Sequence, residues 1–473
     1  MQIPSATPMR FECKSTCTSK VPTSFRTLTP NRTRISECSP YCFLLSRKIL
    51  VLAGWFAMAV QPTTRAADWW TAFGHAGLSA AIEQGLADHP DPNAALARIR
   101  AAEAGVEIAA AGRRPMAMAD AAYRVGREQS MMTGGVADDI EPLMTTARLS
   151  WEIDVFGRVG ASVEAAQARA AMRTADAEAV RLALSLDIAR VYIEVAWLAG
   201  DMTWLEREWV DAQVLHERAE RRVQAGLDDP STVRRAGSAV QQVEHRHMET
   251  AIRHDKARER LRSLLGGSDP AVWPDALDHF ALPPVPDMTG TNLYLSRPDI
   301  VAAYQAWQAA QGESRSAAQS RLPSLALVAS AAGEGDNPAD PEEWSAWVGP
   351  VLTVPLWEPK RTSRARGAAA DASAAEAMFE SASLRAIREI ATARADRQRS
   401  EAMIEHMSER ERLLAAEESS LERKRTAGIV QDADLRMARM TRAAAARDAS
   451  MWIQVGLRNH IDLIGALGGA DGE

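Results

Sequence analysis

Arg222-Val-Gln-Ala-Gly226 is echoed later in the chain by Lys424-Arg-Thr-Ala-Gly428, which keeps a basic residue at its start and Ala-Gly at its end. Two more pairs of segments repeat in the same order: Ala109–Pro115 with Ala317–Pro323, and Leu264–Gly267 with Ala466–Gly469. Each copy is predicted to run through a helix, a proline, a strand pair, a very long helix, a glycine turn, a second helix and a Gly-Gly stop. Stacked solenoid repeats are short and need at least three copies. Two long copies therefore indicate a duplicated domain.

The composition favours long helices. Of the 473 residues, 5% are aromatic and 25% are charged, and Ala, Arg, Glu and Leu dominate. The net charge of −7, with arginine scattered among acidic residues, argues against nucleic-acid binding. The sequence holds no hydrolase, zinc-protease or nucleotide-binding motif, so neither an enzyme nor a cofactor is expected.

The start of the chain is expected to carry a signal peptide. The basic pair Arg47-Lys48 precedes an apolar run from Ile49 to Val60, and the small residues Ala66 and Ala67 follow. This run is too short for a membrane-spanning helix, which needs about 20 residues. The mature chain is expected to begin near Asp68, and residues 1–43 are interpreted as an over-extended start.

All four cysteines lie in this leader: Cys13, Cys17, Cys38 and Cys42. Their spacing would also suit a small zinc site, but the leader interpretation is favoured. The mature chain would then lack cysteine, and with it disulfides, thiol chemistry and the lipid-anchor cysteine of a lipoprotein. No metal site is expected.

The segment Thr146–Phe156 alternates strictly. Its apolar residues are Ala147, Leu149, Trp151, Ile153 and Val155, and its polar residues are Arg148, Ser150, Glu152 and Asp154. Period-two alternation predicts a strand with one apolar and one polar face. Strands are expected at about 116–156 in the first copy and 324–357 in the second, two in each copy.

Two helices are predicted to be far longer than those of globular proteins. No proline interrupts the chain between Gly157 and Gly226, a stretch of about 105 Å at 1.5 Å per residue. The equivalent helix covers roughly 361–427. Shorter helices are expected over 78–112, from a cap at Ser231 to Gly266, and over the ranges 297–321 and 432–467. In each copy the summed length of the two shorter helices roughly equals the length of the long helix. The shorter helices could therefore lie end to end beside the long one and form a wall.

The expected organisation has four parts. Residues 1–67 form the leader, 68–270 the first repeat, 271–296 a proline-rich linker, and 297–473 the second repeat. The fold class is mainly α with a small β part. Four strands from one chain cannot enclose a lumen, whereas the twelve strands of three chains can. The pattern itself does not specify a trimer.

The mature chain resembles the outer-membrane efflux protein family, the TolC-like channels. The resemblance lies in Leu149-Ser-Trp-Glu-Ile-Asp-Val-Phe-Gly-Arg158, in the duplicated glycine turn and in the duplication itself. With Trp69-Trp-x-x-Phe73, the strand segment is most like the outer-membrane factors of RND-type pumps. This resemblance implies a homotrimer in the outer membrane of a Gram-negative bacterium. A transmembrane β-barrel, four strands per chain, would contact outer-membrane lipid, and a long α-helical barrel would cross the periplasm to a periplasmic adaptor and an inner-membrane RND-type pump.

The resemblance also implies roles for the two turns. The adaptor-docking residues would be Gly226, Leu227, Asp228, Gly428, Ile429 and Val430. Family members often carry an aromatic residue three before the second glycine and acidic residues six and nine after it. These positions hold Arg425, Asp434 and Met437 here, so only Asp434 matches.

Asp434, Asp432 and Arg425 are the candidates for a pore constriction. Asp432 and Asp434 also stand at a helix start, where carboxylates stabilise free N–H groups. Arg425 could pair with Asp434 and neutralise it. A pore role and a helix-start role both stay open.

Four tryptophans flank or lie within the expected strands: Trp151, Trp344, Trp347 and Trp357. They would form a membrane-interface belt or serve in ordinary packing.

Three functions follow as candidates. The favoured one is a passive exit duct for drugs or other small toxic compounds in a tripartite efflux system. A duct for type I protein secretion is an alternative that differs only in its pump. A non-conducting periplasmic coiled-coil scaffold is the third, but it has no use for amphipathic strands.

Overall fold

The computed structural model describes residues 69–123, 125–129, 137–140, 143–277, 280–285, 297–335 and 343–469. The expected leader and its cysteines lie outside these residues, as does part of the expected linker.

Two copies of the order helix, strand, strand, long helix, helix follow each other, and the first copy has four further elements. The first copy comprises η1 (Trp69–Phe73), α2 (Ala76–Asp88), α3 (Pro90–Ala111), β1 (Met116–Tyr123), β2 (Gly126–Gln129), β3 (Ala137–Ile140), β4 (Leu143–Ile153), α4 (Arg158–Gln224) and α5 (Pro230–Leu264). The second comprises α6 (Pro298–Gln319), β5 (Ser324–Gly335), β6 (Glu343–Thr353), α7 (Pro359–Thr426) and α8 (Asp432–Ala466). The predicted duplication and mainly helical class are confirmed.

Prolines define where several helices begin. α3, α5, α6 and α7 each start with proline in the first turn, where the missing N–H has no helical partner to lose. The helix expected over 78–112 is therefore two helices, divided at His89, whose side chain caps α3.

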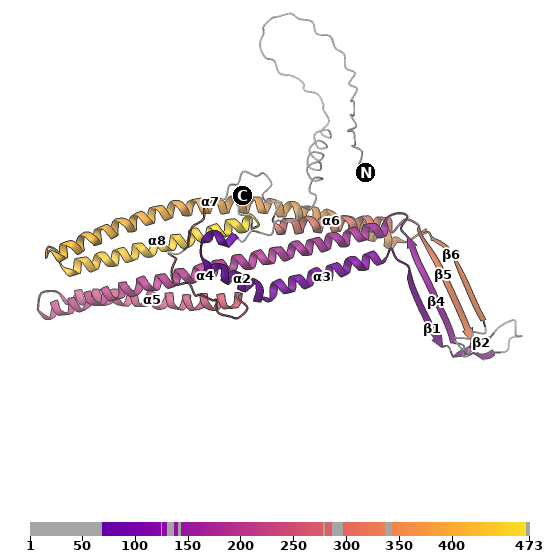
Figure 1. Ribbon diagram of the computed structural model, residues 1–473, viewed down its shortest axis with the longest axis horizontal. Helices are drawn as coiled ribbons and strands as arrows, with labels where there is room; N and C mark the ends of the chain where they lie inside the picture. The colour runs from indigo at the N-terminus through magenta and orange to yellow at the C-terminus, as the bar shows by residue number, and fades with distance from the viewer. Residues whose placement is uncertain are drawn as a thin grey trace, which may run out of the picture. The chain divides into compact units, whose positions relative to one another are not determined.

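The shorter helices line the long ones, as the lengths predicted. α3 and α5 lie end to end along α4, and α6 and α8 lie along α7 (Figure 1). α4 also contacts α6 and α8, so the two copies pack against each other along their lengths.

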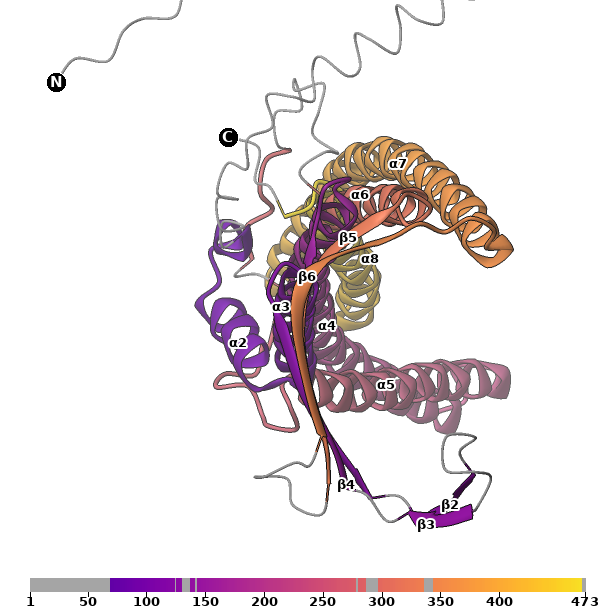
Figure 2. The same ribbon diagram turned by 90° about the vertical axis from the view of Figure 1, so that its right-hand side faces the viewer.

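The strands form an antiparallel sheet in the order β1-β4-β5-β6. All its helix connections leave from one end, because β1 and β5 begin there and β4 and β6 end there (Figure 1). β2 and β3 form a separate two-stranded sheet that was not predicted, beyond the other end (Figure 2). Among the described residues, β1 and β6 each have one edge that no other strand pairs with.

The main apolar core lies around the middle of α4. Trp69 and Phe73 of η1 pack there with Ile188 and Tyr192 of α4 and Ile461 of α8. Towards the turns, the apolar core shrinks to a small cluster of α4 and α5 side chains. Ion pairs also connect the helices in this part of the hairpins.

Candidate functional site

The candidate site begins at the two turns that join α4 to α5 and α7 to α8. Gly226 and Gly428 adopt φ values of 69° and 74°, a left-handed conformation that glycine reaches without steric cost. The N–H of Leu227 donates to the Arg222 carbonyl, and that of Ile429 donates to the Lys424 carbonyl, both at 2.9 Å. Both turns thus have the same Schellman geometry, so the repeated sequence produces a repeated structure.

Each turn presents one aliphatic side chain to solvent. Leu227 is 64% exposed and Ile429 is 71% exposed. Asp228, by contrast, folds back onto Arg222, whose guanidinium donates two hydrogen bonds to it at 2.7 and 3.1 Å. The hydrogen bond from Arg222 lowers the pKa of Asp228. Val430, at the equivalent place in the second turn, is half-buried.

The cap of α5 is not the expected Ser231. Asp229 is the N-cap and accepts a hydrogen bond from the Ser231 N–H at 2.7 Å. Hydrogen bonding by Ser231 lowers the pKa of Asp229. Serine was a plausible cap, but Pro230 takes the first helical position and moves the cap to the residue before it.

Asp434 takes part in a capping box at the start of α8. Its carboxylate accepts the backbone N–H of Gln431 at 3.1 Å, and the Gln431 side chain accepts the N–H of Asp434 in return. Arg425 pairs with Asp432 at 3.0 Å, and the expectation that it could pair with Asp434 is not met. Hydrogen bonds from Arg436 and then Arg425 lower the pKa of Asp432.

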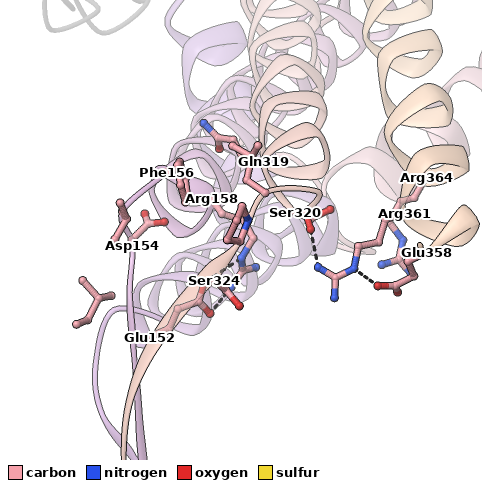
Figure 3. Close-up of a pocket in the computed structure, with 14 residues that line it drawn as sticks. Glu152, Asp154, Phe156, Arg158, Gln319, Ser320, Ser324, Glu358, Arg361 and Arg364 are labelled. Atoms are coloured by element: carbon pink, nitrogen blue, oxygen red, sulfur yellow. Dashed lines mark hydrogen bonds and ion pairs between the residues drawn. The ribbon is translucent and has the colours of Figure 1, made fainter. Parts of the chain in front are cut away.

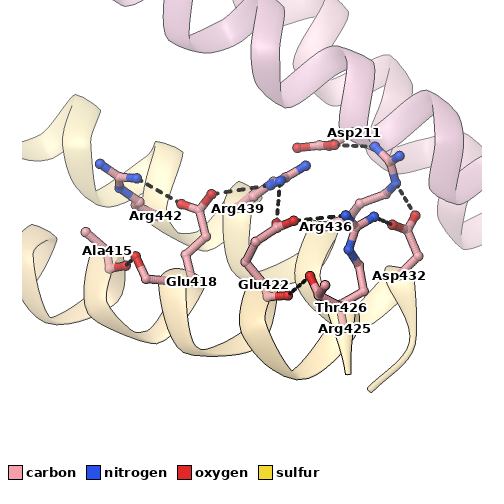
Figure 4. Close-up of polar contacts among 11 residues, drawn as sticks. Asp211, Ala415, Glu418, Glu422, Arg425, Thr426, Asp432, Arg436, Arg439 and Arg442 are labelled. Atoms are coloured by element: carbon pink, nitrogen blue, oxygen red, sulfur yellow. Dashed lines mark hydrogen bonds and ion pairs between the residues drawn. The ribbon is translucent and has the colours of Figure 1, made fainter. Parts of the chain in front are cut away.

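A ladder of arginine–glutamate pairs continues from the second turn between α7 and α8 (Figure 4). Arg439 contacts Glu418 and Glu422, and Arg442 contacts Glu411 and Glu418. None of the described α7 residues beyond Ser400 is fully buried in the chain, so these ion pairs and half-buried apolar side chains such as Ile404 and Leu414 connect α7 to α8 here.

The two hairpins are joined to each other by further ion pairs that the sequence did not indicate. Arg436 of α8 reaches Asp211 of α4 at 2.6 Å (Figure 4). Arg447 contacts Asp201 at 2.6 Å. Asp211 and Asp201 are 9% and 6% exposed, so each carboxylate depends on its guanidinium partner. Arg218 also hydrogen-bonds the Gln431 side chain across the hairpins.

The sheet has one continuous apolar face. Cross-strand partners share a face, and the register brings Leu149 beside Ala117 of β1 and Ala329 of β5. Most other members of this face are also apolar, with Thr145 as the polar exception: Ala119, Ala121, Ala147, Trp151, Ile153, Leu325, Leu327, Ala331, Trp344, Ala346, Val348, Pro350 and Leu352. The opposite face carries Arg148, Ser150 and Glu152.

The strand register shows that the four candidate tryptophans do not share one face of the sheet. Trp151 and Trp344 lie on the apolar face, whereas Trp347 pairs with Ser330 on the opposite face. Trp357 follows the end of β6 and is 88% exposed. The levels of Trp151 and Trp344 are six β5 residues apart, about 20 Å along a strand.

The junction between sheet and helices is polar (Figure 3). Arg158 donates two hydrogen bonds to Glu152, at 3.1 and 2.6 Å. Asp154 accepts the N–H groups of Val159 and Gly160 at the start of α4. Arg361 of α7 donates to the Ser320 carbonyl at the end of α6. These contacts tie the strand ends to the helices.

The described residues show neither a metal-binding cluster nor a membrane-spanning helix. They contain no group of three or more His, Cys, Asp or Glu side chains placed to bind a metal ion. None of their helices combines the length and apolar character needed to cross a bilayer.

The outer membrane efflux protein family model matches residues 81–267 and 291–469, the two copies in turn. The chain belongs to this family. Its members are outer-membrane channels of Gram-negative bacteria, they form trimers, and they are not enzymes.

Comparisons of this chain with individual proteins are consistent with this family assignment. The fusaric acid resistance protein FusA of Burkholderia cepacia is 27% identical over 64% of this chain and 60% of its own length. The pyoverdine export outer membrane protein OpmQ of Pseudomonas aeruginosa is 25% identical over 58% of this chain and 59% of its own. The match thus spans less than two thirds of either relative. The solved structure of VceC from Vibrio cholerae, 21% identical, superposes with a TM-score of 0.74 over 85% of this chain and 99% of VceC, which supports the same fold.

Proposed function

We propose that three copies of this chain form the outer-membrane exit duct of a tripartite efflux system. The sheets would close into one transmembrane barrel, and the helices would continue it as a periplasmic duct. An inner-membrane RND-type pump and a periplasmic adaptor would deliver the substrate. The chain itself would supply a passage and no chemistry.

The apolar face that runs through all four strands carries this proposal. β4, β5 and β6 have 11, 12 and 11 residues, and a tilted strand needs about 9–11 to cross a bilayer. In the part of the chain that the structure describes, β1 and β6 have open edges, which hydrocarbon does not tolerate. Three copies close these edges with three times four strands, an even number typical of outer-membrane barrels.

Trp151 and Trp344 fit the interface belt of such a barrel. They share the apolar face, and their separation of about 20 Å approaches the ~25 Å apolar band of an outer-membrane barrel. Trp347 faces the other way, towards the proposed lumen. A periplasmic scaffold gains nothing from these features, so we disfavour that alternative.

The hairpin turns would dock the adaptor. Leu227 and Ile429 project from equivalent positions, so each chain offers two similar aliphatic contacts. Gly226 and Gly428 shape the turns, Val430 backs the second one, and the Asp228–Arg222 pair stiffens the first.

The substrate class is a small molecule. The relatives are named for fusaric acid resistance and for pyoverdine export, and both compounds are small. Those names favour small-molecule efflux over protein secretion. The pump would select the compound, because solvated duct walls discriminate little.

The ion pairs between the hairpins would keep the periplasmic end closed. Asp211 loses its partner if α8 moves away from α4, and breaking a buried ion pair by removing one partner costs about 3–5 kcal/mol. Asp434 would form an acidic constriction in the trimer, while Arg425 and Arg436 neutralise Asp432.

Single-channel recording in planar bilayers tests the function and the closure together. The wild-type trimer should give small unitary currents, and Arg436→Gln should enlarge them. Arg439→Gln is the matched control, because among the described residues Arg439 forms its ion pairs with Glu418 and Glu422 of α7 and with no carboxylate of α4. An absence of unitary currents from every form would refute the duct, and equal enlargement by both substitutions would refute the closure.

A further inference from the structure

A cluster of basic side chains surrounds the end of the sheet where the helices leave. These junction cations are Arg113, Arg114, Arg321, Lys360 and Arg364. Arg113 and Arg114 follow α3 and precede β1, whereas Arg321 stands between α6 and β5. Lys360 and Arg364 lie in the first turns of α7. Because all four helix connections share this end, the cations gather at one level.

No carboxylate within the described residues pairs with these five cations. The acidic groups nearby are already engaged: Glu152 binds Arg158, Asp154 caps α4, and Glu358 pairs with Arg361 (Figure 3). All five junction cations are exposed. The junction therefore presents an uncompensated positive charge.

Large apolar side chains accompany this charge. Leu356 and Trp357 are 92% and 88% exposed, and they immediately precede α7. Phe156, in the connection from β4 to α4, is 45% exposed. The order along the structure is thus an apolar sheet face, then exposed aromatic residues, then free guanidinium and ammonium groups. A membrane interface has the same order, from hydrocarbon to headgroup.

We propose that the junction cations bind anionic phospholipid headgroups of the leaflet on the helix side, with Leu356 and Trp357 beside the upper acyl chains. Guanidinium groups suit phosphate because they donate paired hydrogen bonds in a fixed plane. This inference rests on the proposed function, which puts the sheet in the membrane. It adds a preference for negatively charged lipid, which a duct does not itself require.

Spin-labelled lipids report this preference. The trimer is reconstituted in phosphatidylcholine vesicles, and the motionally restricted fraction is measured with spin-labelled phosphatidylglycerol and with spin-labelled phosphatidylcholine. The wild type should favour phosphatidylglycerol, and salt should weaken that preference by screening. A variant with Arg113→Gln, Arg114→Gln, Lys360→Gln and Arg364→Gln should lose at least about fivefold in relative association, the effect of one basic residue at an anionic surface.

A matched control removes the same charges elsewhere. Arg234→Gln, Arg235→Gln, Arg423→Gln and Lys424→Gln also replace three arginines and one lysine, but near the hairpin turns. This variant should keep the wild-type lipid preference. Equal association of both lipids with the wild type overturns the inference, as does a preference that survives high salt or that both variants lose equally.

Unitary currents in pure phosphatidylcholine bilayers separate this inference from the proposed function. Currents without a lipid preference would overturn the headgroup site alone. No currents in any lipid would overturn the duct on which it rests.

Discussion

Replacing Leu149 with arginine would put a charge on the apolar face of the sheet. Leu149 lies on the inner strand β4, with Ala117 and Ala329 as its cross-strand neighbours. Its side chain is 40% exposed in the chain, so the substitution removes little packing within one copy. The main free-energy cost of the substitution must then come from the surroundings of this face in the assembled protein.

The magnitude follows from the position of Leu149 between the two tryptophan levels. Leu149 is two residues from Trp151, about 7 Å along the strand, and about 14 Å from the level of Trp344. An arginine on a lipid-facing barrel position costs about 2–4 kcal/mol at the midplane and about 0–1 kcal/mol near the interfaces. We expect about 2 kcal/mol per chain, or about 6 kcal/mol for the three chains of a trimer.

Urea unfolding of protein refolded into phosphatidylcholine vesicles measures this cost. Ser150→Arg is the matched control, since Ser150 is the next residue along β4 and belongs to the opposite face. It should cost less than about 1 kcal/mol. Equal losses from the two substitutions, or a larger loss from Ser150→Arg, would refute the assignment of the apolar face to lipid.

Three further predictions concern the helices. Gly428→Val should destabilise the protein by about 1–3 kcal/mol, because the φ of 74° at this position strains a β-branched residue. The control is Gly367→Ala inside α7, which should not destabilise the protein. Thermal melts compare the two variants. Burial, and then Arg397, lower the pKa of His460 to about 4. Between about pH 6.5 and 4, His460 is therefore protonated in the unfolded chain but neutral in the folded chain. The free energy of unfolding should fall by up to ~3 kcal/mol as the pH drops through this range. In urea titrations, His460→Gln should remove this part of the pH dependence. Asp434→Asn can keep the cap through its amide oxygen but should reduce cation preference in reversal-potential measurements; unchanged selectivity would leave only the helix-start role.

Much of the fold could be predicted because its signals are local. The absence of proline between Gly157 and Gly226 predicted α4, and strict alternation predicted the two faces of β4. β5 contains mostly alanine and other small residues, which differ little in polarity. Its faces became clear only from the register, which matches Leu325 and Leu327 to apolar partners on both sides.

The contacts between the hairpins could not be predicted in the same way. Arg436 and Asp211 are 225 positions apart, and no local rule selects such partners. One signal was present: Asp201, Glu208 and Asp211 recur on one side of α4, and all three are buried. The partner of Arg425 was missed for a related reason, because the Asp434 carboxylate turns back to the Gln431 N–H instead.

Disulfide trapping between the edge strands tests the central claim, closure of three sheets into one barrel, most directly. All native cysteines precede Asp68, so Ala119→Cys in β1 can be paired in turn with a cysteine at Trp344, Ala346 or Val348 in β6. Within one chain, three strand spacings of about 4.8 Å separate β1 from β6, about 14 Å in all, which is beyond the ~7 Å reach of a disulfide. We predict covalent trimers on non-reducing gels for the pair that is in register between neighbouring copies. Monomers alone across the whole set, from protein that has reached the outer membrane, would contradict the barrel.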